Sequence, residues 1–161
     1  PLLILGIWVE ETAFKREIAT VSEKHLLIAK NVAAALDRYA QDVESSFFFF
    51  SESLLAGQPT NAAIALAKRN GFRHVCIIDN EGRVTSLLSV TDDGPTSIPK
   101  KLLSKLRPIM TAAGPAFSPV MKDAEGRGTI FLIQRLGRDQ IAIGALELGY
   151  IRRLQQTVFF G

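Results

Sequence analysis

The sequence lacks the features that several protein classes require. Its one cysteine, Cys76, cannot form an internal disulfide. The 19 basic residues are matched by 16 acidic ones and cluster in nothing longer than pairs, so we expect no nucleic-acid partner. Neither a phosphate-binding glycine loop nor a nucleophile elbow is present, and we expect no cofactor. The composition, 47% hydrophobic and 22% charged over 161 residues, excludes a disordered chain and predicts one folded domain.

Glycine and proline are also absent over a long stretch near the N-terminus. Gly6 and Gly57 enclose fifty residues without either helix breaker, so we predict a long helix over residues 10–57, as one helix or two joined smoothly. Apolar residues recur in it at alternating three- and four-residue steps, which is typical of a coiled coil. Such a helix is longer than a domain of this size, so part of it should project and form a homodimer with a second copy. The predicted dimer residues are Phe14, Ile18, Val21, Ile28, Val32, Leu36, Tyr39 and Val43.

Four consecutive phenylalanines occupy positions 47–50 of this helix. Neighbouring helical residues point in different directions, so Phe47 and Phe50 can share one face while Phe48 and Phe49 point elsewhere. We expect some of these rings to pack on a sheet and the others against a partner or a covering loop. The alternative is that one or two of them line a ligand cavity.

The first nine residues, PLLILGIWV, are apolar without a break, and charged residues follow them. This change, with Trp8 at the boundary, is expected where a transmembrane helix leaves the membrane. Because a spanning helix needs about 20 apolar residues, we interpret residues 1–9 as the end of a clipped transmembrane segment. A buried helix start or the remnant of a signal peptide is the alternative. The interpretation implies a protein of the inner (cell) membrane with this domain periplasmic or extracellular.

The rest of the chain predicts a sheet with helices to one side. Thr60 and Gly71 bound a short helix, Gly82 lies in a tight turn, and Pro99 opens a helical crossover that ends near Pro108. The predicted strands are 75–79, 83–89, 116–121, 128–136 and 140–148, and a closing helix starts near Tyr150. Short turns between strands imply a five-stranded, largely antiparallel sheet and an α+β fold.

Two segments carry a family resemblance. The run FRHVCIIDNEGRV resembles the first hairpin of Cache domains, the extracytoplasmic relatives of PAS domains, and IAIGALELGYIRRL is similar to their last strand and closing helix. The resemblance implies a PAS-like sensor core at residues 58–149, followed at 150–161 by a closing helix or a linker. The ending RLQQTVFFG resembles the linker inside a double Cache module, which would make this chain the membrane-distal half.

The resemblance also implies a ligand site between the sheet and the crossover at residues 89–116. By strand alternation Phe131, Ile133 and Arg135 share one face, and Glu147 ends the matching face of the next strand. Arg135 and Glu147 could hold a charged group of the ligand, or could form a rim salt bridge or solvated strand ends. Further candidates near the crossover are Thr85, Ser86 and Phe117. The only tryptophan, Trp8, lies at the membrane end, which disfavours the family's amino-acid ligands.

Catalytic and metal sites are not indicated. His74 and Cys76 share a strand face, but Cys76 is surrounded by apolar residues and is better interpreted as a small buried hydrophobe. His25 has no histidine or cysteine one turn away, as a zinc site would need. Asp92 and Asp93 lack the spacing of a calcium loop and predict a solvated turn.

These observations predict a non-enzymatic sensor module. The first hypothesis is the extracytoplasmic ligand-sensing domain of a bacterial transmembrane signalling receptor, with a sensor histidine kinase of a two-component system as the output. A diguanylate cyclase or a chemoreceptor is the alternative output, and any kinase or cyclase activity would reside in a cytoplasmic domain. The hypothesis of another class is a dimerisation or protein-docking module without a small-molecule ligand. An intracellular enzyme is the third.

Overall fold

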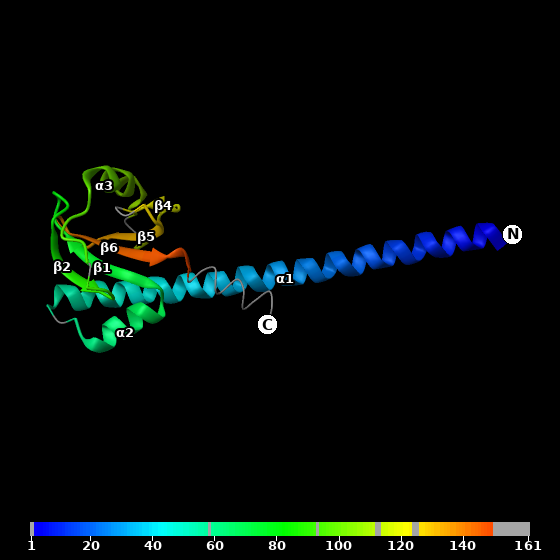
Figure 1. The fold of residues 1–161 in the computed structure, drawn as a ribbon, viewed down its shortest axis with the longest axis horizontal. Coiled ribbons are helices and arrows are strands. Elements are labelled where there is room, and N and C mark those ends of the chain that lie inside the picture. The colour runs from blue at the N-terminus through cyan, green and yellow to red at the C-terminus, as the bar shows by residue number, and fades with distance from the viewer. Residues whose placement is uncertain (1, 58, 93, 112–113, 124–125, 150–161) are drawn as a thin grey trace.

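A single long helix enters an α+β domain at one end. The computed structural model describes residues 2–57, 59–92, 94–111, 114–123 and 126–149, with side chains described from residue 21 onward. Helix α1 (Leu2–Leu55) runs for 54 residues, about 80 Å at 1.5 Å per residue, and much of it extends away from the domain (Figure 1). This confirms the prediction of a long N-terminal helix and shows that it is continuous. In the described part of the chain, no helix is both long and apolar enough to span a bilayer.

The sheet has six strands, so the prediction of five is wrong. The strands are β1 (Phe72–Ile78), β2 (Val84–Ser89), β3 (Ala116–Phe117), β4 (Met121–Lys122), β5 (Gly128–Arg135) and β6 (Ile141–Glu147). Their order is β2-β1-β6-β5-β3, β4 also pairs with β5, and every pairing is antiparallel. The expected strand 116–121 is split into β3 and β4 at Ser118–Val120, where Pro119 has no N–H to donate to a ladder.

Helices cover both faces of the sheet, which corrects the expectation of helices on one side. Helices α1 and α2 (Asn61–Arg69) lie against one face, while α3 (Lys100–Leu106) and the short 3₁₀ turn η1 (Arg107–Ile109) lie over the other (Figure 1). The reason is visible in β6, where all six residues from Ile141 to Leu146 are buried. A strand that buries both faces needs a cover on each side.

The phenylalanine run divides as helix geometry requires. Phe47 and Phe50 are fully buried and pack on Phe72 of β1, with ring centroids 6.3 Å and 5.6 Å from it. Phe48 and Phe49 are each 52% exposed. The prediction that the four rings serve different surfaces is therefore confirmed, and the buried pair fixes the end of α1 to the sheet.

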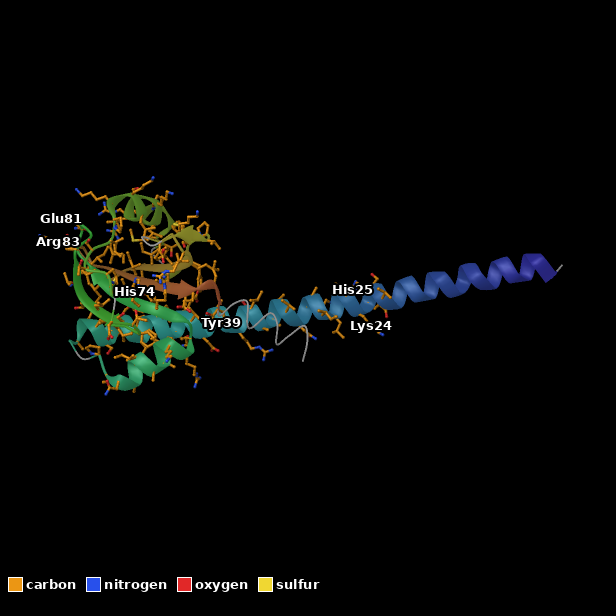
Figure 2. All side chains as sticks on the ribbon, viewed as in Figure 1. Lys24, His25, Tyr39, His74, Glu81 and Arg83 are labelled. Atoms are coloured by element: carbon orange, nitrogen blue, oxygen red, sulfur yellow. The ribbon has the colours of Figure 1, made fainter. Side chains whose placement is uncertain are left out.

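The predicted dimer surface is only partly available. Val43 is completely buried under the sheet, so its assignment to a dimer surface is wrong. Tyr39 lies where α1 meets the domain (Figure 2) and is half-buried. Its hydroxyl donates a hydrogen bond to the carbonyl oxygen of Asn70 at 3.0 Å. Both residues belong to the domain because the apolar stripe of α1 passes beneath the sheet from Tyr39 onward. Val21 and Ile28, farther along the projecting part, are exposed.

Local signals at the predicted helix and turn boundaries are confirmed. The Thr60 hydroxyl caps α2 by accepting a hydrogen bond from the Ala63 N–H at 3.2 Å, and Gly71 follows the helix with φ +79°. Gly82 has φ +88°, and Pro99 precedes α3. The predicted closing helix at residues 150–161 lies outside the described residues.

Candidate functional site

Two hairpin turns in the sheet share one sequence pattern and one geometry. DNEGR at 79–83 joins β1 to β2, and DAEGR at 123–127 joins β4 to β5. In each turn one aspartate oxygen accepts the arginine backbone N–H, at 2.9 Å from Arg83 and 2.7 Å from Arg127. The second oxygen accepts the arginine Nε–H, at 2.8 Å and 3.1 Å respectively. The glycines in fourth position have φ +88° and +78°, so the two turns form a matched pair.

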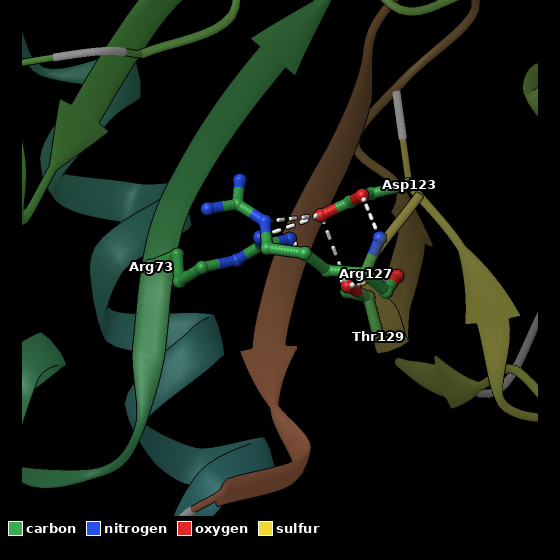
Figure 3. Close-up of polar contacts among 4 residues, drawn as sticks. All are labelled: Arg73, Asp123, Arg127 and Thr129. Atoms are coloured by element: carbon green, nitrogen blue, oxygen red, sulfur yellow. Dashed lines mark hydrogen bonds and ion pairs between the residues drawn. The ribbon is translucent and has the colours of Figure 1, made fainter. Parts of the chain in front are cut away.

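The second turn differs from the first because it forms part of a buried ion-pair network. The Asp123 side chain is 6% exposed, against 26% for Asp79. Arg73 of β1 reaches over β6 to place one guanidinium nitrogen 2.5 Å from the Asp123 carboxylate and to donate a hydrogen bond to the Thr129 hydroxyl at 2.9 Å (Figure 3). Two strand spacings amount to about 10 Å, which only a long side chain can bridge. The network therefore ties β1 to the β4–β5 turn.

The electrostatics of the network favour an ionised Asp123. Burial alone raises the pKa of this carboxyl, but the hydrogen bonds from Arg73 and Arg127 outweigh burial and hold the pKa at about 2. The Thr129 hydroxyl lies 3.3 Å from the same carboxylate. The Nε of Arg73 is buried and has no hydrogen-bond partner in the described part of the chain. Such a network is costly to break because each charge depends on the others.

A groove opens beside this network, between α3 and β4. Its volume is about 490 Å³, within the range of about 300–1,000 Å³ of small-molecule sites. It lies on the sheet face covered by the crossover, where the resemblance implies a ligand site. Its lining residues are Pro99, Lys101, Leu102, Lys105, Val120, Met121, Lys122 and Asp123. Asp123 therefore belongs to both the groove and the ion-pair network.

The predicted ligand residues do not gather around one site. Phe131 and Ile133 are buried in the apolar core beneath α3 and do not line the groove. Phe117 packs against the core on the α1 face instead. Ser86 pairs with Ile77, which belongs to that same α1 face. The Thr85 hydroxyl donates to the Ile77 carbonyl oxygen at 3.2 Å, so Thr85 is engaged with its own hairpin.

Arg135 and Glu147 lie at opposite ends of the β5–β6 hairpin. The register pairs Arg135 with Ile141 and Glu147 with Thr129. The two charged residues are thus separated by six residue steps, about 20 Å along the strand. Both are exposed. They cannot form a salt bridge with each other, and one small charged group cannot contact both.

Sequence reasoning missed Arg73, Asp123 and Thr129, although signals for each were present. Thr129 precedes Phe131 by two residues and so shares its strand face. Arg73, with His74 beside it, interrupts a strand whose other residues are all apolar, FRHVCII. The pattern D-x-E-G-R occurs at both turns, and in each turn the aspartate accepts hydrogen bonds from the arginine. This repetition indicates that the turn requires its aspartate, and so it singles out Asp123.

Cys76 is unsuited to nucleophilic chemistry. It is fully buried, and burial raises the pKa of its thiol to about 12. A thiol with that pKa stays protonated at neutral pH, whereas the thiolate is the nucleophile. The interpretation of Cys76 as a buried hydrophobe is confirmed. Within the described residues no group of three histidine, cysteine or acidic side chains is placed to hold a metal ion.

Comparisons with known proteins add no family assignment. No family model matches this sequence, and a search of curated proteins found no significant match. The α+β fold with its antiparallel sheet and long N-terminal helix stands on the structure alone.

Proposed function

We propose that the chain is the extracytoplasmic ligand-sensing domain of a bacterial transmembrane signalling receptor, with a PAS-like fold of the Cache type and a sensor histidine kinase as output. One observation carries the proposal: the domain that contains the groove is joined directly to one continuous 54-residue helix. A helix without a break transmits displacement or rotation at its domain end to its far end. In the proposed receptor that far end continues into the membrane.

A continuous series of contacts supports coupling between the groove and α1. Asp123 in the groove wall is bonded to Arg73, and Arg73 directly follows Phe72 in β1. Phe72 packs against Phe47 and Phe50 of α1. A ligand that moves β4 relative to α3 would therefore change the packing beneath α1. It can bias the two arrangements only by its difference in affinity for them.

The proposed homodimer uses the projecting part of α1, from Phe14 to Leu36. The same face of the helix is covered by the sheet from Tyr39 onward, where Val43 is fully buried. Two parallel helices paired through this face must therefore diverge at about Tyr39. Divergence at this point places the domain where it can control the angle between the two helices.

A protein-docking module is the second candidate function, and exposed aromatic surface supports it. Phe48 and Phe49 are each 52% exposed, and Leu55 on the same helix is 43% exposed. Large apolar side chains exposed close together are typical of protein interfaces. A docking module would use this surface and would need no small molecule in the groove.

A thermal-shift screen of the 161-residue protein separates the two functions. The panel contains small carboxylates, amines and sugars, and we expect at least one class to stabilise the protein. A ligand at a hundred times its dissociation constant raises the melting temperature of a protein of this size by about 5–10 °C. A panel that leaves the melting temperature unchanged at millimolar concentrations contradicts the sensor and favours docking. The complete gene tests the proposed output: it should encode a second membrane span followed by a cytoplasmic histidine kinase domain. A cyclase or chemoreceptor domain at that place would contradict the kinase as the output.

A further inference from the structure

We propose that the groove between α3 and β4 binds an organic anion that carries an apolar portion. The inference rests on the proposed sensor function and specifies the chemical class of its ligand. It is carried by the charges and apolar side chains that line the groove. The relevant lining residues are Lys101, Leu102, Lys105, Val120, Met121, Lys122 and Asp123.

Three lysines place positive charge on both walls of the groove. Lys101 and Lys105 are one helical turn apart on α3, and Lys122 lies opposite them on β4. Like charges at this helical spacing repel each other. None of the three ammonium groups forms an ion pair with another described residue. An anion between the walls would relieve the repulsion on α3 and bridge α3 to β4.

Asp123 does not neutralise these lysines. Among the described lining residues it is the only acidic one, and its oxygens are engaged by Arg73 and Arg127. With the two arginines included, five basic groups surround one carboxylate. The potential in the groove is therefore positive, which favours an anion and opposes a cation.

The groove also offers apolar surface for the rest of the ligand. Leu102 and Met121 are partly buried in the floor, while Val120 is 58% exposed at the edge. An aliphatic or aromatic portion of the ligand would remove the Val120 side chain from water. A bare inorganic anion would leave this surface exposed, so we expect it to bind more weakly than an organic one.

A second hollow on the other side of α3 also has three basic residues and one acidic residue among its described lining residues, but two of these basic groups already have partners: Arg83 is ion-paired, and Arg107 donates a hydrogen bond to the Asn80 carbonyl oxygen. This hollow has a volume of about 740 Å³ and contains both Glu81 and Arg83. The Arg83 guanidinium forms ion pairs with two carboxylates, at 3.2 Å from its Nη2 to Oε2 of Glu81 and at 2.8 Å from its Nε to Oδ2 of Asp79. Lys100 lines this hollow rather than the groove. Lys100 is therefore a matched control position, because it is the same residue type on the same helix.

The first experiment compares four probes against the 161-residue protein by thermal shift and isothermal titration. Hexanoate carries both features, acetate the charge alone, hexanol the chain alone, and hexylamine the opposite charge. We expect hexanoate to bind most tightly, and to raise the melting temperature by about 5–10 °C at a hundred times its dissociation constant. Its affinity should fall as salt is added, since the lysines are exposed and screened.

The second experiment tests the location of the site. Lys101→Glu and Lys122→Glu should each weaken hexanoate at least about tenfold, because a charged hydrogen-bond donor is replaced by a repelling carboxylate. Lys100→Glu should leave the affinity within about twofold, and circular dichroism should show all three variants folded. Equal binding of hexanol and hexanoate, preference for hexylamine, or unchanged affinity in Lys101→Glu overturns the inference. If sugars or amines bind while carboxylates do not, the sensor function survives and the anionic class is wrong; if nothing binds, the sensor function fails as well.

Discussion

The buried ion-pair network makes a quantitative prediction for Asp123→Asn. The pKa of Asp123 is about 2 in the folded protein against an ordinary value of 3.8, because hydrogen bonds from Arg73 and Arg127 outweigh the opposing effect of burial. A difference of this size corresponds to about 2 kcal/mol of folding free energy at neutral pH. Removing one member of a buried pair also leaves the other charge, here Arg73 at 9% exposure, without its partner, which typically costs about 3–5 kcal/mol.

We therefore expect Asp123→Asn to destabilise the protein by about 3 kcal/mol at pH 7, near the lower end of that range because the amide retains one acceptor oxygen. For a chain of this length the melting temperature should fall by about 6–12 °C. Circular dichroism at 222 nm during heating measures it. The matched control is Asp79→Asn in the β1–β2 turn, where the arginine partner, Arg83, is 71% exposed. We expect a clearly smaller fall in the melting temperature for this variant.

The pH dependence has a definite sign. The folded-state pKa of Asp123 is depressed, so its contribution is complete above pH 3.8 and is lost as the pH falls through about 2. The gap in stability between the native protein and Asp123→Asn should therefore be constant from pH 7 to pH 5 and narrow by about 1 kcal/mol, to about two thirds of its value at pH 7, by pH 3. Equal effects of the Asp123 and Asp79 substitutions at pH 7, or a gap that does not narrow at pH 3, would refute the account of the network.

Three further predictions concern other parts of the chain. Cys76 should react with a disulfide reagent such as DTNB at the rate of global unfolding, because its thiol is fully buried with a pKa of about 12; rapid labelling of the native protein would contradict this. Gly82→Ala should destabilise more than Gly126→Ala in urea unfolding: both glycines have positive φ, but an added Cβ lies 2.9 Å from a backbone oxygen only at Gly82. In membranes containing the intact receptor, cysteines placed at Ile28 should crosslink between copies and those at Val43 should not; equal crosslinking would exclude divergence of the helices.

The sequence predicts the helices and turns better than it predicts which faces of the sheet are covered. The long helix, the Thr60 cap and the turn at Gly82 each depend on local chemistry that neighbouring residues determine, and each is confirmed. The split of residues 116–121 into two strands depends on Pro119, which has no N–H to donate to a ladder. Burial of β6 on both faces could have been inferred from IAIGALE, since this run does not alternate between apolar and polar residues.

The candidate site was harder to predict because its parts come from separate elements. Arg73 and Thr129 are 56 residues apart in sequence and meet only because β6 inserts between β1 and β5. No local sequence pattern predicts this strand order. The predicted pocket residues Phe131 and Ile133 were placed on the correct face, the one covered by α3, but they fill the core there. Alternation identifies the face of a strand, whereas the position of α3 decides whether that face is filled or hollow.

The spacing of the apolar stripe on α1 explains how one helix face can serve two purposes. Phe14, Val21 and Ile28 are seven residues apart, a repeat that favours a left-handed supercoil with a second helix. Farther on, Val32, Val43 and Leu54 are eleven residues apart, or 3.67 per turn, close to the 3.6 of a straight helix. Val43 and Leu54 are buried under the sheet. The change of repeat thus falls between Ile28 and Val32, within the projecting part and about two turns before the sheet begins to cover the helix at Tyr39. The sequence therefore suits the helix up to Ile28 to pairing and the helix beyond Tyr39 to packing on its own sheet.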